Sequence, residues 1–170
     1  MQHHLPPYSE FLSSVLGGDS NLSIYLVGAC ERHNFGDMLM PHVIQQLIQK
    51  QAASSCVGLI DVDLRDDGGH RVLSCETAFR TQKSAPTVIH FGGATLGCDL
   101  AYGYSMTTTG AEREEMVRMM QDDPMAAREF AGEQTGFKGH TAYVIDAKTR
   151  CKNAEICVSR GWTFRAGNTR

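Results

Sequence analysis

The chain has 170 residues, 19 acidic against 16 basic side chains, a formal net charge of −3 and 42% hydrophobic residues. This length is that of one ordinary domain, and the composition excludes a disordered or fibrous protein. Because the Lys and Arg residues are scattered and outnumbered, we expect no nucleic-acid partner.

The cysteines and the chain start indicate a compartment. The six cysteines are widely spaced and form no CxxC pair, which favours reduced thiols over a zinc ribbon or a redox motif. The first 18 residues lack the basic and long apolar regions of a signal peptide, and no run approaches the roughly 18 apolar residues of a membrane span. We therefore expect a cytoplasmic protein with no transmembrane segment.

The first predicted elements are a helix, a strand and a second helix. Residues 7–17 carry apolar side chains at helical spacing before two glycines, and residues 22–29 form an apolar run typical of a buried strand. The next helix should begin near Asp37, a good N-cap, because Pro41 costs least in the first turn. Its sheet-facing residues are predicted to be Leu39, Met40, Val43, Ile44, Leu47 and Ile48.

Further strands and helices follow in an order typical of an α/β protein. Residues 56–64 and 87–91 read as two more buried strands. Residues 111–121 and 124–134 have helical propensity, and the first of these helices has an apolar patch predicted to be core, made by Met116, Val117, Met119 and Met120. Residues 143–145 and 156–158 are predicted to be short strands.

Two small-residue loops follow buried strands and define a candidate cleft. The first, GACERHNFGD at 28–37, leads into a helix N-terminus, where backbone N–H groups and the helix dipole favour anions. It matches neither the P-loop pattern nor the GxGxxG dinucleotide pattern, so a ligand site and an ordinary strand-to-helix turn both fit it. The second, HFGGATLGCD at 90–99, has glycines where a side chain would obstruct a ligand.

Other polar residues are weighed against structural roles. Asp61 and Asp63 follow the second strand and could bind ribose hydroxyls, although solvated strand-end carboxylates are more common. The histidines show no HExxH or HxH spacing, so no metal is expected and most are assigned structural roles. His90 is the exception that we keep, because it precedes the second glycine loop.

The two loops together resemble the N-terminal half of the polysaccharide pyruvyl transferase family. The segment LVGACERHNFGDMLMPHVIQQLI and the later VIHFGGATLG carry the resemblance, which covers about residues 21–105 and more faintly 140–158. It implies a Rossmann-like three-layer α/β domain with a mainly parallel sheet, like one lobe of a GT-B-like fold. The implied division is a leading helix and flexible start at 1–20, this domain at 21–158 and an irregular tail at 159–170.

The resemblance also implies an activity. Members of the family transfer an enolpyruvyl group from phosphoenolpyruvate to a sugar of a cell-surface or exopolysaccharide, forming a pyruvate ketal. No cofactor is implied beyond this donor substrate, and the partner would be a glycan or lipid-linked sugar acceptor. The substrate-binding residues would be Asn34, Gly36, Asp37, His90, Gly92, Gly93 and Thr95. The general acid and base are not identified by the sequence.

The sequence departs from the family pattern at two places, and alternative functions therefore stay open. Ala94 stands where a third glycine is common, and the chain ends where the second lobe of the family would begin, which predicts a truncated transferase completed by a second lobe or a homo-oligomer. One alternative is a non-catalytic nucleotide- or sugar-phosphate-binding domain that uses the same loops. Another is an inactive remnant that pairs with a partner chain.

Overall fold

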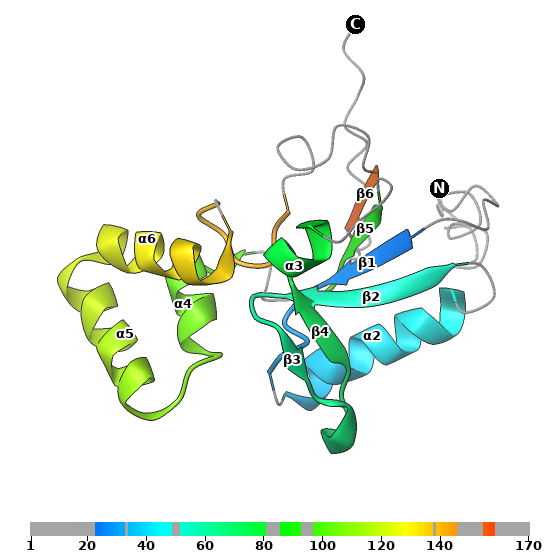
Figure 1. The fold of residues 1–170 in the computed structure, drawn as a ribbon, viewed down its shortest axis with the longest axis horizontal. Helices are drawn as coiled ribbons and strands as arrows, with labels where there is room; N and C mark the ends of the chain where they lie inside the picture. The colour runs from blue at the N-terminus through cyan, green and yellow to red at the C-terminus, as the bar shows by residue number, and fades with distance from the viewer. Residues whose placement is uncertain are drawn as a thin grey trace, which may run out of the picture.

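A six-stranded, mainly parallel sheet forms the centre of the protein (Figure 1). The computed structural model describes residues 23–32, 34–48, 52–80, 86–92, 97–137, 139–145 and 155–158. The strands are β1 (Ser23–Val27), β2 (Ala53–Gly58), β3 (Val62–Asp63), β4 (Arg71–Ser74), β5 (Thr87–His90) and β6 (Glu155–Val158). The strand order is β3-β4-β2-β1-β5-β6, and only β3 runs antiparallel to its neighbour. The expected α/β class with a mainly parallel sheet is thus confirmed.

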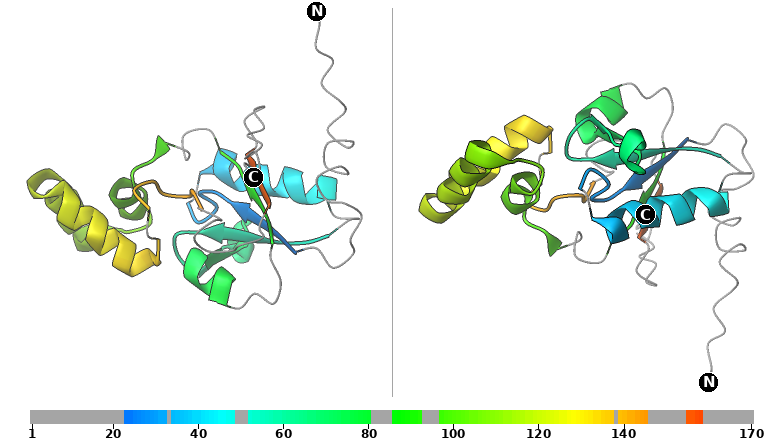
Figure 2. Two further views of the ribbon diagram at one scale, coloured as in Figure 1. Left: turned by 90° about the horizontal axis from the view of Figure 1, so that it is seen from above. Right: turned by 90° about the horizontal axis from the view of Figure 1, so that it is seen from below.

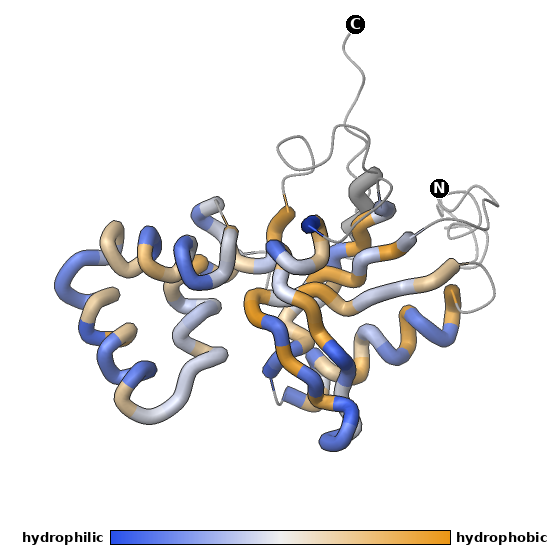
Figure 3. The backbone as a smooth tube through the Cα atoms, viewed as in Figure 1, coloured by the Kyte–Doolittle hydropathy of each residue, from blue (hydrophilic) through white to orange (hydrophobic). Residues whose placement is uncertain are grey.

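Helices lie on both faces of this sheet. The helices are α2 (Phe35–Ile48), α3 (Cys75–Arg80), α4 (Leu100–Ser105), α5 (Gly110–Asp122) and α6 (Pro124–Thr135), with a 3-10 turn η1 at Arg65–Asp67. Figures 1 and 2 show α2 on one face and α3 on the other. Successive side chains of β1 point to opposite faces of the sheet. Ile24 and Leu26 pack with Ile44 and Ile48 of α2, whereas Tyr25 and Val27 belong to a separate buried cluster. The apolar stretches of the chain concentrate on these strands (Figure 3).

The helices α4, α5 and α6 form a group beyond the carboxyl ends of β1 and β2 (Figures 1 and 2). Asp99 caps α4 by accepting from the N–H of Ala101, and its other carboxylate oxygen binds Arg128 of α6. Asp123 caps α6 in the same way, and Gly136 ends α6 with a left-handed φ of 70°. Specific polar contacts therefore fix how these helices begin, end and hold together.

Three predicted elements differ from the structure. The helix expected to begin near Asp37 begins at Phe35, and Asn34 accepts a hydrogen bond from the N–H of Gly36 at 3.1 Å as a cap would. The strand expected at 56–64 is instead β2 at Ala53–Gly58 and the short β3, because the chain turns away from the sheet after Gly58. Residues 143–145 are not a strand, whereas β6 confirms the strand expected at 156–158. The leading helix expected at 7–17 lies outside the described residues.

The buried face of α2 also differs from the prediction. Pro41, Ile44 and Ile48 are buried against the sheet. Four of the six residues expected there are exposed instead: Leu39, Met40, Val43 and Leu47. The other apolar helix patch is half confirmed, since Met116 is buried and Met119 and Met120 pack against the core, while Val117 is exposed. Apolar residues surround much of α2, so periodicity selects the wrong stripe.

Candidate functional site

The candidate site lies at the carboxyl ends of β1 and β5, where neighbouring strands are reached from β1 in opposite directions. From β1 the chain passes through α2 to β2 on one side, and β5 pairs with the other side of β1. In open α/β sheets, ligands bind beyond the carboxyl ends of the strands at such a switch point. Gly28 and Phe91 follow the two strands directly, and a Cβ at Gly28 would lie 2.7 Å from the Phe91 ring. This glycine therefore lets the two loops approach closely.

The start of α2 lies beside this switch point. Asn34 and Gly36 are exposed, and Phe35 between them has 74% of its surface exposed. Asp37 lies in the first helical turn, where its negative charge suits the positive end of the helix dipole. Its carboxylate does not cap the helix as predicted; it accepts from the guanidinium of Arg32.

Arg32 and Asp37 form a partly buried ion pair. The Arg32 Nη2 lies 3.0 Å from the Asp37 Oδ2, and the two side chains are 19% and 17% exposed. Burial by itself would lower the pKa of Arg32, but the hydrogen bond to Asp37 and nearby negative charge raise it above its usual value. The Nε of Arg32 is buried with no partner among the described residues. Arg32 is thus held beside the start of α2 by its bond to Asp37, with further N–H donors that this bond does not use.

Behind this pair, Glu31 is a buried carboxyl group. Its Oε1 accepts from the Tyr143 hydroxyl at 2.7 Å and from the Leu59 N–H at 3.2 Å, while its Oε2 has no partner among the described residues. Burial raises the pKa of Glu31, although these hydrogen bonds oppose the shift. A Cβ at Gly58 would overlap with Oε2, so the glycine makes room for the carboxyl group. Glu31 therefore ties the β1 loop to the end of β2.

Tyr143 joins three parts of the site. Its hydroxyl donates to Glu31, its carbonyl oxygen accepts from the Nδ1 of His90 at 2.8 Å, and its own φ is 58°, a left-handed value unusual for a non-glycine residue. Burial and the Glu31 charge raise the pKa of Tyr143. The segment that carries it is held by hydrogen bonds between its backbone and residues 98–100, including Ala142 N–H to the Cys98 carbonyl at 2.8 Å.

The predicted site residues lie at the ends of two neighbouring strands. Asn34, Gly36 and Asp37 lie at the start of α2, which follows β1, and Gly92 follows β5 with a φ of 94°. His90 is buried, its Nδ1 bonds to the carbonyl oxygen of Tyr143, and burial lowers its pKa. Gly93 and Thr95 lie outside the described residues.

No protein family, curated protein or solved structure matches this chain.

The structure adds Glu31, Arg32 and Tyr143 to the site. The adjacent Glu and Arg directly after an apolar strand were visible in the sequence, but a charged pair in a loop ordinarily indicates solvent exposure. Tyr143 lies 112 residues from Glu31 and carried no local signal. Only the folded sheet brings these residues to one place.

Other expectations concern thiols, metals and membranes. Cys30, Cys56, Cys75 and Cys98 are free thiols, as expected. Within the described part of the chain, no cluster of three or more His, Cys, Asp and Glu side chains could hold a metal ion. None of the described helices has the length and hydropathy that a membrane span requires.

Proposed function

We propose that this chain is the N-terminal lobe of a polysaccharide pyruvyl transferase, with its substrate site in the crevice beyond β1 and β5. One observation carries the proposal: the NFGD segment, which carries the family resemblance, begins α2 at the switch point and lies beside the buried charge of Arg32. Phosphoenolpyruvate is a small polyanion, and a guanidinium next to a helix N-terminus suits its phosphate and carboxylate groups.

The described residues suggest distinct roles within this proposal. Arg32 would contact an anionic group of the donor, since a guanidinium has five N–H donors and Asp37 accepts from one of them. Asn34 and Asp37 would orient hydroxyl groups of the acceptor sugar. Glu31 and Tyr143 would act as positioning residues, because they are buried and hold the loop that carries Arg32.

The nucleotide-binding alternative receives less support from the structure. Asp61, the residue expected to bind a ribose, accepts hydrogen bonds from the Ser74 N–H, the Ser74 hydroxyl and the Thr77 hydroxyl. Despite the opposing effect of burial, these bonds lower the pKa of Asp61. Asp63 is bound by Arg65. Both carboxylates therefore serve local structure, so we rank this function second.

Calorimetric titration with phosphoenolpyruvate tests the proposal. We expect the purified chain to bind it and Arg32→Gln to weaken binding about tenfold or more, as loss of a charge-assisted hydrogen bond implies. Arg118→Gln, which removes an exposed charge on α5, is the matched control and should leave the affinity unchanged. A folded chain that binds no phosphoenolpyruvate, or binds it equally well without Arg32, would contradict the donor site.

Turnover is tested separately. The chain would be mixed with phosphoenolpyruvate and a panel of glycan acceptors, and phosphate release would be followed. Phosphate release that depends on both acceptor and Arg32 would support the transferase assignment. If the chain binds the donor without releasing phosphate, and adding a second α/β lobe starts phosphate release, the lobe assignment would be supported. Nucleotide binding without any response to phosphoenolpyruvate would favour the second-ranked function.

A further inference from the structure

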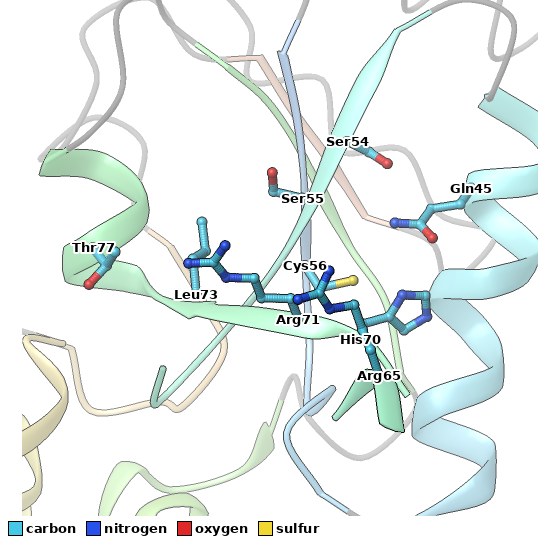
Figure 4. Close-up of a pocket in the computed structure, with 9 residues that line it drawn as sticks. All are labelled: Gln45, Ser54, Ser55, Cys56, Arg65, His70, Arg71, Leu73 and Thr77. Carbon is cyan, nitrogen blue, oxygen red and sulfur yellow. The ribbon is translucent and has the colours of Figure 1, made fainter. Parts of the chain in front are cut away.

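A polar cavity of about 530 Å³ lies at the amino ends of β2 and β4, away from the switch point (Figure 4). It exists because β2 is longer than its neighbour. β4 pairs with β2 only from Cys56 to Gly58, whereas β1 pairs with it from Ala53. Residues 53–55 therefore pass the start of β4 and leave a notch, bounded by α2 on one face of the sheet and α3 on the other.

The lining of this notch is rich in hydrogen-bond donors and contains no acidic residue. Arg65 and Arg71 are its charged members, and Ser54, Ser55 and Gln45 add hydroxyl and amide groups. In Figure 4 the two guanidinium groups lie in front of β2, with Ser55 above Arg71 and Gln45 on the side of Arg65. A site with two positive groups and several neutral donors is complementary to an oxyanion.

The guanidinium groups of the two arginines differ in the number of hydrogen bonds that they make to other residues. Arg65 donates from Nε and Nη2 to the carboxylate of Asp63, which fixes its orientation and leaves its other nitrogen available. The side chain of Arg71 is exposed and makes no hydrogen bond or ion pair within the described residues, although Asp63, its neighbour across the β3–β4 pair, is close enough for its pKa to be lowered by the Arg71 charge. One cation is thus held in place, and the other has its full donor capacity.

His70 supplies an independent indication that a ligand binds here. Its side chain lines the notch between Arg65 and Gln45 (Figure 4), only 8% of its surface is exposed, and its Nε2 is buried with no partner among the described residues. The backbone of Met38 raises the pKa of His70, whereas burial and the neighbouring His42, whose ring centroid is 3.8 Å away, lower it. An unpaired buried ring nitrogen is costly unless something else satisfies it, and a hydroxyl group of a ligand could do so.

We propose that this notch binds a phosphate monoester, with Arg71 and Arg65 contacting the phosphate oxygens and His70 contacting a hydroxyl of the same ligand. The site is separate from the crevice, lies at the amino end of β4, and does not depend on the transferase assignment. Its ligand class is a phosphorylated hydroxy compound such as a sugar phosphate.

The test uses the full chain in an Arg32→Gln background, so that an anion bound in the crevice does not contribute. Binding of inorganic phosphate and of glucose 6-phosphate would be measured by calorimetry. We expect both to bind and Arg71→Gln to weaken both about tenfold or more. His70→Phe should weaken the sugar phosphate more than inorganic phosphate. Arg118→Gln should change neither.

The outcomes separate this proposal from the first. No binding of either probe, or equal binding with and without Arg71, would overturn the notch site. Because Arg71 is exposed, its replacement is not expected to unfold the chain, and an unchanged urea unfolding midpoint would verify this. A failed assay of phosphoenolpyruvate at Arg32 leaves the Arg71 comparison fully interpretable, because that comparison is made within the Arg32→Gln background and with other probes.

Discussion

At the scale of single residues, the crevice is organised by buried polar groups that hold one another. Glu31 is buried, and one of its oxygens receives two hydrogen bonds while the other packs over Gly58. Burial raises the pKa of this carboxyl group, and the hydrogen bonds from Tyr143 and Leu59 oppose that shift. The position of Arg32, the next residue, follows from this anchorage. The partly buried Arg32 is therefore held in place because the carboxyl group next to it in the chain is anchored.

His90 predicts how stability depends on pH. Because burial lowers its pKa below its usual value near 6.5, the unfolded chain binds a proton that the folded chain does not once the pH falls below about 6.5. The free energy of unfolding should therefore decrease as the pH falls from 7.5 to 5.5, by up to about 1.4 kcal/mol per pH unit for this one group. Urea unfolding at a series of pH values measures it. His90→Gln should flatten the dependence, His140→Gln at an exposed position should not, and an unchanged slope in His90→Gln would refute the assignment.

At the scale of elements, the sequence predicted what local patterns determine and failed where distant contacts decide. The strand at β5 and the helices α5 and α6 were predictable, because an apolar run, first-turn acids and a proline at the helix start are local signals. The loop that contains Asn34 and Gly36 was predicted to lead from the first strand into a helix, and it does. Tyr143 was not, because its left-handed backbone and its bond to Glu31 depend on a segment 112 residues away.

The buried face of α2, which the sequence pattern predicted wrongly, can be tested by mutation. Val43 and Ile44 are neighbours in one apolar run, but Val43 is 48% exposed and Ile44 only 3%. Ile44→Ala should lower the free energy of unfolding by about 2–4 kcal/mol, since it leaves a cavity against β1. Val43→Ala should change it by less than about 0.5 kcal/mol. Equal losses in urea unfolding would mean that the outer stripe of α2 is covered in solution.

At the scale of the whole molecule, the sheet and the group α4–α6 share one core. The same buried cluster contains Val57 and Leu59 at the end of β2 and Leu100 at the start of α4. A Cβ at Gly103 of α4 would lie 3.3 Å from the Leu59 side chain and 2.7 Å from Ala142. The three helices are therefore packed onto the carboxyl end of the sheet, next to the segment that carries Tyr143, and do not form an independent unit.

Shared packing predicts that both parts unfold together. Leu100→Ala, at a residue that is 1% exposed, should lower the free energy of unfolding by about 2–4 kcal/mol. Native-state hydrogen exchange should show equal losses of protection in β1 and in α6, because one cooperative transition governs both. Val117→Ala, on the exposed side of α5, is the control and should leave both unchanged. Loss of protection in α6 with β1 unaffected would instead mean that the helices open alone, and the segment that carries Tyr143 would then be able to move independently of Arg32.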